Sequence, residues 1–310
     1  MTNHYFSHAR TALKYGIKSF DINKCILVPD FICDVVSDTI KETNIVIFYK
    51  TFNNFKPDWN YLNKLVSDNN CSSIIMVNYF GIPQDIEKFI DFCEKYKLCL
   101  IEDNAHGFGG KYQDKLLGDI GDISISSPRK LLNIYSGGIL KINNEKYKLE
   151  KIYLDNFPVT KLNKLRKNNK FKFNYMKKFA KNYIFSRPSY EKLNTSESKI
   201  KDHNIDSYSK IIIKETRIDT KKRVDKFNIW QSFFKKNNLI PVFEDLQNYE
   251  LNPWCCPAYV ENYKDSSYWF DWGWRNNIFI FSWPNLPDEH LNNSKIIDRR
   301  RKLICFSTNF

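Results

Sequence analysis

Residues 98–138 read LCLIEDNAHGFGGKYQDKLLGDIGDISISSPRKLLNIYSGG, and this stretch decides the fold. A short apolar run ends on two adjacent acids, Glu102 and Asp103. A second β-prone run, 123–126, leads into Ser127 and Lys130. In open α/β sheets the carboxyl ends of the strands border the ligand-binding crevice. The sequence therefore predicts an acid, a hydroxyl and an amine at one edge of a sheet.

Short apolar strands alternate with amphipathic helices through the first half of the chain. The clearest helix is expected over 85–97, where Ile86, Phe89, Ile90 and Cys93 follow the i, i+3, i+4, i+7 spacing. This alternation predicts an α/β fold with a mostly parallel central sheet and helices on both faces. Further helices are expected over 7–20 and 59–66, and strands over 25–28, 44–49, 73–77, 98–101 and 123–126.

The composition is that of a globular chain with a sizeable core. The chain has 310 residues, of which 42% are hydrophobic and 16% aromatic, and this is more apolar than disordered chains are. Apolar runs are too short to span a bilayer, and the first ten residues contain no apolar signal-peptide core. We therefore expect a cytoplasmic protein without a membrane span.

Neither the cysteines nor the net charge identifies a partner. The eight cysteines include no CxxC pair and no zinc-binding spacing, so we interpret them as small buried hydrophobic residues and expect no metal site. The formal charge is +13, which suits nucleic acid, an anionic membrane surface or anionic substrates. The chain is rich in Lys, Asn and Ile throughout, so this charge is weak support for any of them, and we do not expect nucleic acid.

After residue 142 the character of the sequence changes. Residues 161–181 hold nine Lys or Arg and no acid, interleaved with aromatic residues. Three interpretations of this stretch stay open. It could be a nucleic-acid surface or a set of cations for a diphosphate-bearing substrate, but we prefer a solvated helix pair or a mobile insertion. A long helical segment is expected over 205–237. We predict a large domain over 1–203, in which 151–203 is a basic divergent insertion, and a small α+β domain over 204–310.

The pairing of Asp103 with Lys130 is what a pyridoxal phosphate enzyme requires. Lys130 would form the Schiff base with this cofactor and, once freed, would move protons as general base and acid. Asp103 would keep the pyridine nitrogen protonated, which makes the ring an electron sink. Ser127 is expected to bond the phosphate, and His106 to lie against the ring or near its phenolic oxygen.

Simpler interpretations stay open for two of these residues. Asp103 also suits the N-cap of a short helix over 104–106, and His106 also suits a hydrogen-bonded core histidine. The glycines at 107, 109 and 110 lack the spacing of a dinucleotide-binding loop and are expected to serve tight turns.

The order of several short motifs resembles the DegT/StrS-type sugar aminotransferases, which are fold-type-I pyridoxal phosphate enzymes. The most specific block joins 101–106 to 118–122, 127–132 and the glycine pair 137–138. Weaker matches lie at 9–13, 29–31, 78–81, 283–287 and 303–306. The resemblance extends in register over 7–142 and returns over about 204–310.

The resemblance implies further site residues and partners. Backbone amides at Ala9 and Arg10 would bind the cofactor phosphate, and Phe31 would stack on the cofactor ring. The implied enzyme is a homodimer that transfers an amino group from glutamate to a nucleotide-linked keto sugar, in polysaccharide or related sugar biosynthesis. The departures from the family pattern are Ala9, Asn78, His106, Ser136 and a missing substrate-reading segment after Gly138.

Two other functions remain as alternatives. The same cofactor site could run a sugar dehydration or act on an amino acid, although relatives that dehydrate typically replace the lysine with histidine. A binding protein with a degenerate site is the third possibility, and the altered residues Ala9 and Asn78 motivate it. Such a protein would use 161–181 for an anionic partner.

Overall fold

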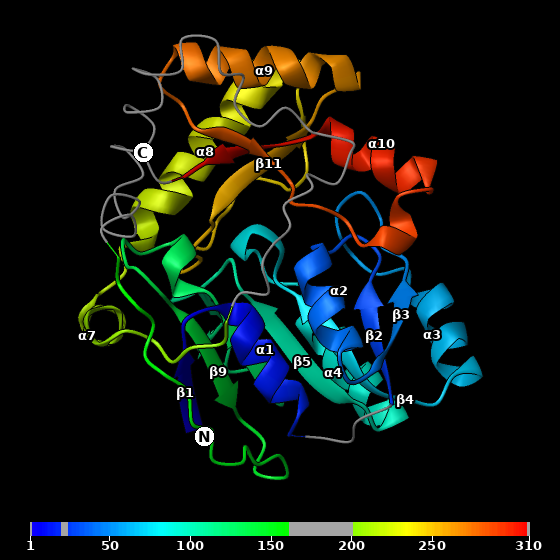
Figure 1. Cartoon of the computed structure of the whole chain (residues 1–310). Helices are drawn as coiled ribbons and strands as arrows, with labels where there is room; N and C mark the ends of the chain where they lie inside the picture. Colours follow the sequence, from blue (N-terminus) through cyan, green and yellow to red (C-terminus); the bar gives the residue numbers. More distant parts are fainter. Residues whose placement is uncertain (1, 20–23, 161–200, 309–310) are drawn as a thin grey trace.

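The computed structural model describes residues 2–19, 24–160 and 201–308 (Figure 1). Its strands form a large sheet in the order β1-β9-β8-β5-β4-β2-β3. β9 runs antiparallel to both of its neighbours, and the other pairings in the sheet are parallel. The strands are β1 (Thr2–Phe6), β2 (Cys25–Pro29), β3 (Ile45–Tyr49), β4 (Cys71–Val77), β5 (Cys99–Asn104), β8 (Ile123–Ser126) and β9 (Gly138–Ile142).

Residues of the central strands alternate between two apolar cores, one on each face of the large sheet. Ile26 and Ile75 pack on one face with α1 (Ala9–Ile17) and α2 (Asp34–Lys41). Leu27 and Ile74 pack on the other face with α3 (Trp59–Asp68) and α4 (Ile86–Tyr96). Strands buried on both faces are typical of parallel sheets. The predicted α/β architecture with helices on both faces is confirmed.

The C-terminal part of the chain forms a second, antiparallel sheet in the order β10-β11-β13-β12. Before it in the chain comes α7 (Ser207–Glu215), whose Ile213 packs with Ile134 and Ile139 of the large domain. The predicted boundary at 204 therefore precedes a helix that packs on the large sheet. The remaining elements are α8 (Thr220–Lys236), β10 (Ile240–Pro241), β11 (Cys255–Tyr259), α9 (Tyr263–Arg275), β12 (Ile280–Ser282), α10 (Ser294–Lys302) and β13 (Leu303–Ser307).

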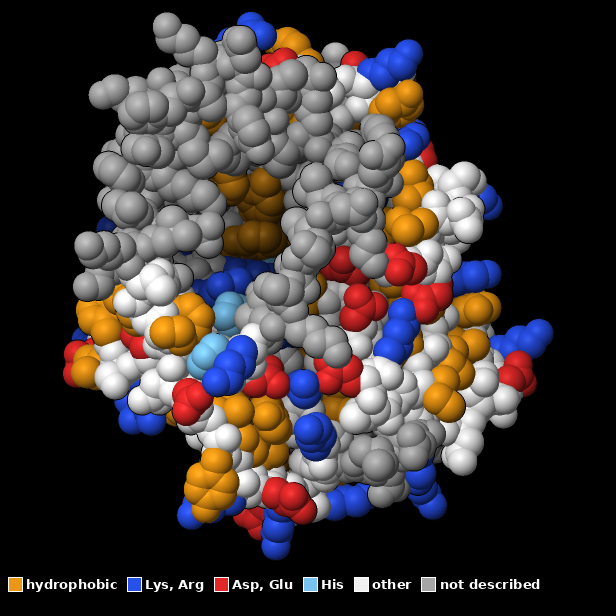
Figure 2. All heavy atoms as spheres, in the orientation of Figure 1, with side chains coloured by type: hydrophobic (Ala, Val, Ile, Leu, Met, Phe, Trp, Pro, Cys, Tyr) orange, Lys and Arg blue, Asp and Glu red, His pale blue; other side chains and the backbone are white. Residues whose placement is uncertain are grey.

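The two sheets meet above the carboxyl ends of the parallel strands. The Trp254 amide, just before β11, donates to the Phe80 carbonyl at 2.8 Å, and the Tyr259 hydroxyl donates to the Asn53 carbonyl at 2.9 Å. Figure 2 shows a hollow where the two sheets meet, with Lys, Arg and His side chains at its edge and hydrophobic side chains deeper inside. The fold thus places a recess at the strand ends where the sequence predicts its polar residues.

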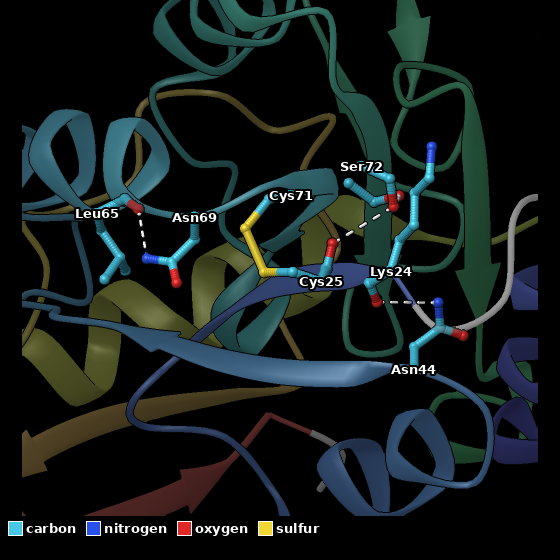
Figure 3. Close-up of a disulfide and its surroundings, with 8 residues drawn as sticks. Lys24, Cys25, Asn44, Leu65, Asn69, Cys71 and Ser72 are labelled. Atoms are coloured by element: carbon cyan, nitrogen blue, oxygen red, sulfur yellow. Dashed lines mark hydrogen bonds between the residues drawn. A yellow bond between two sulfur atoms is a disulfide. The ribbon is translucent and has the colours of Figure 1, made fainter.

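One pair of cysteines departs from the prediction that all eight are small buried hydrophobic residues. Cys25 and Cys71 form a disulfide between β2 and β4 (Figure 3). The two residues are cross-strand partners at the start of their strands. Cross-strand pairing between residues 46 positions apart leaves no local signature in the sequence. Of the other cysteines, Cys33 is partly buried and the rest are buried, as predicted.

Several elements differ from the sequence prediction. The single helix expected over 205–237 is two helices, because Asp219 caps a new helix by accepting from the Lys222 amide. The short strands β1 and β11 and the helices α2 and α10 were not predicted. The basic stretch 161–181 lies outside the described residues.

Candidate active site

Lys130 ends a 3₁₀ turn, Pro128–Lys130, that directly follows β8. The Lys130 amide donates to the Ser127 carbonyl at 3.0 Å, and Pro128 at the first position of the turn fixes its own φ. Burial lowers the pKa of Lys130 to about 8, and the nearby Arg129 acts in the same direction. The Asp103 carboxylate and the thiols of Cys33 and Cys255 oppose this shift. More of the Lys130 amine is therefore uncharged near neutral pH than in an ordinary lysine.

Asp103 lies in the buried end of β5, at the same edge of the sheet as the Lys130 turn. The two strands are parallel neighbours, with Asn104 opposite Ser126. Asp103 Oδ1 accepts from the Ala105 amide at 3.0 Å. Burial raises the pKa of Asp103, while the charge of Lys130 and the Ala105 amide act to lower it. Asp103 is thus part of a strand rather than the cap of a helix, and it interacts electrostatically with Lys130.

His106 is a buried, neutral imidazole beside these two groups. Burial lowers the pKa of His106 well below its usual value, and the charge of Lys130 adds to the shift. Its Nδ1 accepts from the Phe80 amide at 3.2 Å, so the ring proton resides on Nε2, which can donate. His106 is therefore hydrogen-bonded in the core and also lies in the site, so its two interpretations are compatible.

Trp254 is a site residue that sequence reasoning missed. Its ring stacks on His106 with centroids 4.6 Å apart and planes 18° apart. The Lys130 Nζ lies 4.9 Å from the centre of the same ring. Trp254 immediately precedes β11, more than 120 positions after Lys130. No local motif signals this contact, because it depends on how the second sheet packs over the first.

The start of α1 provides the second half of the site. His8 is its N-cap residue with extended backbone angles, and the helix begins at Ala9 and Arg10. Burial lowers the pKa of His8 to about 3, and the charges of Arg129, Arg10 and then His203 contribute. Two arginines therefore lie near a helix N-terminus, whose amides and dipole also favour an anion.

Two glycines bring this helix start against the Lys130 turn. The Gly137 amide donates to the Ser7 carbonyl at 2.8 Å. A Cβ on Gly137 would lie 3.4 Å from the backbone nitrogen of Arg129. A Cβ on Gly138 would lie 2.1 Å from the His8 carbonyl carbon, which no side chain could occupy. The glycine pair therefore keeps Ser127, which is buried, and the Lys130 turn close to the helix start.

Phe31 has a different set of neighbours from those expected of a residue that stacks on a cofactor. Its ring is fully buried and contacts Phe55 and Trp283, and the Arg299 guanidinium lies 4.4 Å from its centre. Cys33, two residues later, is the residue of this segment that influences Lys130 electrostatically. The structure thus brings Asp103, His106 and Lys130 together and gives Phe31 a packing role.

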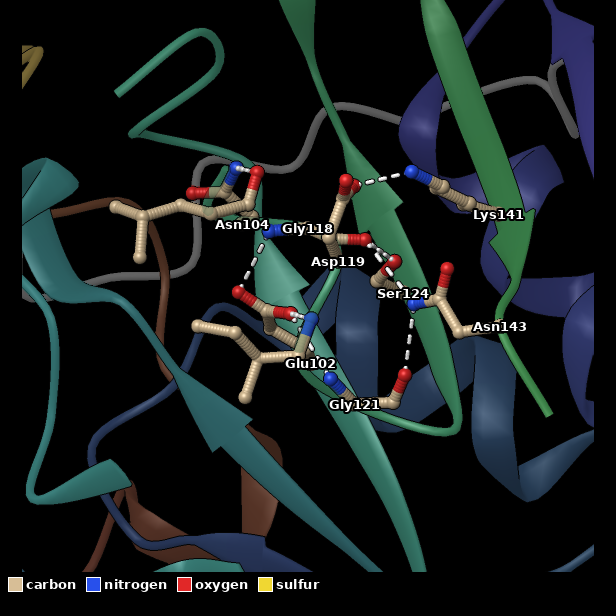
Figure 4. A network of polar contacts seen from close by, with 10 residues as sticks. Glu102, Asn104, Gly118, Asp119, Gly121, Ser124, Lys141 and Asn143 are labelled. Atoms are coloured by element: carbon tan, nitrogen blue, oxygen red, sulfur yellow. Dashed lines mark hydrogen bonds and ion pairs between the residues drawn. The ribbon is translucent and has the colours of Figure 1, made fainter. Parts of the chain in front are cut away.

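Glu102, next to Asp103, holds a loop rather than the site (Figure 4). Its Oε1 accepts from the Gly118 amide at 2.7 Å and from Asn78 Nδ2 at 2.9 Å. Its Oε2 accepts from the Ile120 and Gly121 amides at 3.0 and 3.1 Å. Asn78, one of the departures from the family pattern, thus binds a carboxylate that supports the loop 117–122.

The described residues contain neither a cluster of metal ligands nor a membrane-spanning helix. Within 2–19, 24–160 and 201–308, no three His, Cys, Asp or Glu side chains gather as metal ligands would. In the same ranges no helix has the length and apolar character needed to cross a membrane.

Comparison with known proteins gives the same picture of the chain. GDP-perosamine synthase from Escherichia coli O157:H7 is 34% identical over 79 residues, which is 25% of this chain and 22% of that protein. The match therefore spans about a fifth of that curated relative. The solved structure of Helicobacter pylori PseC, an aminotransferase involved in the biosynthesis of pseudoaminic acid, covers 99% of this chain with 81% of its own, at 14% identity and a TM-score of 0.65.

A second solved structure, NtdA from Bacillus subtilis with bound cofactor PMP, has a TM-score of 0.66 at 14% identity, over 100% of this chain and 70% of that chain. Such similarity at low identity establishes the fold-type-I transferase fold predicted from the motifs. A sequence model of the DegT/DnrJ/EryC1/StrS aminotransferase family matches residues 6–182, more than half of the chain. The chain therefore belongs to the DegT/DnrJ/EryC1/StrS aminotransferase family.

Proposed function

We propose that this protein is a pyridoxal phosphate-dependent aminotransferase that transfers an amino group, from glutamate, to a nucleotide-linked keto sugar. The observation that supports the proposal is the electrostatic interaction of buried Asp103 with Lys130 at the carboxyl ends of the neighbouring strands β5 and β8. Family membership supports the aminotransferase class. The sugar substrate is supported by relatives such as GDP-perosamine synthase.

The residues present suit the cofactor. Asp103 is an acid that can hold a pyridinium nitrogen, and Lys130 is an amine whose pKa is lowered to about 8 by burial. The start of α1, together with Arg10 and Ser127, offers donors for a phosphate. Gly138 packs directly against His8 and Ala9 at the start of α1, where no side chain would fit.

The bound cofactor would supply an aldehyde and an electron-withdrawing ring. The side chains supply the rest of the chemistry. Lys130, uncharged in part at neutral pH, would move a proton between the substrate Cα and the cofactor C4′ as general base and acid. Asp103 would fix the charge on the ring nitrogen, and the neutral His106 would donate from Nε2 to an oxygen of the ring.

We also propose that the protein is a cytoplasmic homodimer in polysaccharide or related sugar biosynthesis. Fold-type-I sites form between two subunits, which supports the dimer. A single species of monomer mass in light scattering of the cofactor-loaded protein would contradict it. Reducing compartments rarely preserve disulfides, so alkylation of whole cells tests the location: reduced Cys25 and Cys71 would support the cytoplasm, and an intact Cys25–Cys71 disulfide would argue against it.

Two alternatives have less support. A dehydratase in this family typically has histidine at the lysine position, and this chain has Lys130. The degenerate-site alternative was motivated by Ala9 and Asn78, yet Asn78 bonds Glu102 in the loop network. The phosphate-binding amides at Ala9 and Arg10 are backbone groups, so replacing a glycine by alanine there removes no donor.

Borohydride trapping tests the proposal. Incubation with pyridoxal phosphate joins the Lys130 amine to the aldehyde with loss of water, and borohydride then supplies hydride to fix the new C–N bond. We expect one label per chain on the Lys130 peptide. Lys130→Ala should lose that label, whereas Lys115→Ala, at an exposed position in β7 (Lys115–Leu116), should keep it. A label spread over surface lysines would overturn the assignment.

Half-reaction spectra separate transfer from the alternatives. Addition of glutamate to the loaded protein should convert the bound cofactor to its amino form and release an equimolar amount of 2-oxoglutarate. A cofactor spectrum that does not change with glutamate, in protein that traps on Lys130, would favour dehydration. Absence of trapping in the wild-type protein would favour the degenerate-site alternative.

A further inference from the structure

Arg223, on α8 of the small domain, reaches the backbone next to Lys130. Its Nη2 donates to the Leu131 carbonyl at 3.0 Å, and its Nη1 donates to Thr308 Oγ1 at 3.3 Å. Arg223 is partly buried, and burial lowers its pKa to about 10, so the side chain stays charged at neutral pH. A charged guanidinium donates stronger hydrogen bonds than a neutral group does.

The Leu131 carbonyl lies at the end of the turn that contains Lys130. That turn is short: the Lys130 and Leu131 amides donate back to Ser127 and Pro128 at 3.0 and 2.9 Å. Carbonyl groups at the end of such a turn point onward and need partners from elsewhere. Arg223 supplies one of these partners, so it constrains the peptide plane that directly follows Lys130.

Thr308 extends the contact to the opposite wall of the recess. Its hydroxyl accepts from Arg223 and lies 2.6 Å from the Pro253 carbonyl and 3.0 Å from the Trp254 carbonyl, to which it can donate. Trp254 is the residue whose ring faces both the Lys130 amine and His106. One guanidinium is therefore linked to the backbone on both sides of the recess.

We propose that Arg223 is a positioning residue. Through its bonds to Leu131 and Thr308 it fixes the position of the Lys130 amine relative to the Trp254 ring. Arg223 does not itself touch the cofactor site in this role. The proposal rests on the function assigned to Lys130 above. It adds that the small domain sets the geometry of an amine that belongs to the large domain.

Two variants and one control test this role in the full-length protein. Arg223→Met keeps much of the side-chain volume and removes every donor, and Arg223→Lys keeps the charge but has a single donor nitrogen, which cannot span both acceptors in the same geometry. Arg275→Met, at an exposed position of α9, is the matched control. The probe is pyridoxal phosphate, and the readouts are the rate at which its bound absorbance band develops, the borohydride label on Lys130, and the thermal midpoint.

We expect Arg223→Met to slow cofactor capture on Lys130 by about tenfold or more, because misplacement of a reacting group by about 1 Å costs up to about a hundredfold in rate. Arg223→Lys should recover part of that rate, and Arg275→Met should match the wild type. Thr308→Val, which keeps Arg223 and its bond to Leu131, should have a smaller effect in the same direction. If Arg223→Met fails to fold, Arg223→Lys and Thr308→Val still decide the question, since both must slow capture.

Capture at the wild-type rate in Arg223→Met, with or without a lower thermal midpoint, would overturn the positioning role and leave Arg223 as a structural contact. Equal rates in Arg223→Lys, Thr308→Val and the wild type would do the same. A wild-type protein that captures no cofactor on Lys130 would instead overturn the proposed function, and this role with it. The wild-type trap therefore distinguishes the two failures.

Discussion

Glu102 and Asp103 are adjacent in β5, yet the strand directs their side chains to opposite faces of the sheet. Both carboxylates are buried, at 0% and 6% exposure. Glu102 accepts from Asn78 and from three backbone amides of the loop 117–122. Asp103 accepts from the Ala105 amide and lies in the electric field of Lys130.

The two carboxylates therefore have different roles in one fold, because their hydrogen-bond and charge partners differ. Burial raises the pKa of Glu102, and its several N–H donors offset part of this desolvation, while the carboxylate holds those donors in place. A buried carboxylate that faces an amine changes the proton affinity of that amine instead. Burial and residue type are alike in both positions, so the partners decide the role.

The largest expected effect separates the two acids by activity. Asp103→Asn keeps an oxygen for the Ala105 amide but removes the negative charge, so it should reduce the glutamate half-reaction on the order of 10²–10³-fold. The free energy of unfolding should change by less than about 1 kcal/mol. Stopped-flow spectra of the loaded protein and urea unfolding provide the two measurements. A half-reaction rate close to that of the wild type would remove Asp103 from the site.

Glu102→Gln should show the reverse pattern. An amide group cannot accept at both ends, so at least one of the loop amides at Gly118, Ile120 or Gly121 would face a donor. We expect a loss of about 2–4 kcal/mol in the free energy of unfolding, with the charge on Lys130 little affected. Glu94→Gln, at an exposed position of α4, is the control and should change stability by less than about 0.5 kcal/mol. Equal stability of the two variants would show that the loop network contributes little.

The smallest effect concerns the pH dependence of Lys130. The groups that act on its amine are Asp103, Cys33 and Cys255, which raise its pKa, and burial and Arg129, which lower it to about 8. The reactive, uncharged fraction of the Lys130 amine should therefore rise with pH through a midpoint of about 8 and then level off. Loss of the Asp103 charge in Asp103→Asn should move this midpoint to lower pH, whereas Glu102→Gln should leave it unchanged. Acetylation of the Lys130 peptide in cofactor-free protein, followed by mass spectrometry, gives the midpoint; a shift to higher pH in Asp103→Asn would contradict the pairing.

Much of the fold could be predicted because it depends on local patterns. The apolar runs at 25–28, 73–77 and 123–126 became β2, β4 and β8 within a few residues. These strands are buried on both faces over most of their length, and the continuous apolar runs in the sequence indicate this directly. α10 escaped prediction because its residues 294–302 are mostly charged, and only Ile296, Arg299 and Arg300 are buried among them.

The interaction of Asp103 with Lys130 could be predicted for a similar reason. Asp103 and the Ser127–Lys130 segment come at the ends of consecutive parallel strands, and topology brings such ends together. Phe31 and Trp254 show where this reasoning stops. The family motif has an aromatic residue at Phe31. In the structure this ring packs against Phe55, Trp283 and Arg299, which come from other parts of the chain.

The sequence by itself determined the alternation of strands and helices, the two-sided burial of the large sheet, and the acid and amine at its edge. These follow from hydrophobic periodicity and from the fixed direction of parallel strands. Only the tertiary structure decided that Glu102 serves a loop while Asp103 faces Lys130, that Trp254 covers His106, and that Arg223 reaches Leu131. These contacts join residues that are distant in sequence or that lie on opposite faces of a strand. Their geometry is set by tertiary packing rather than by any local pattern.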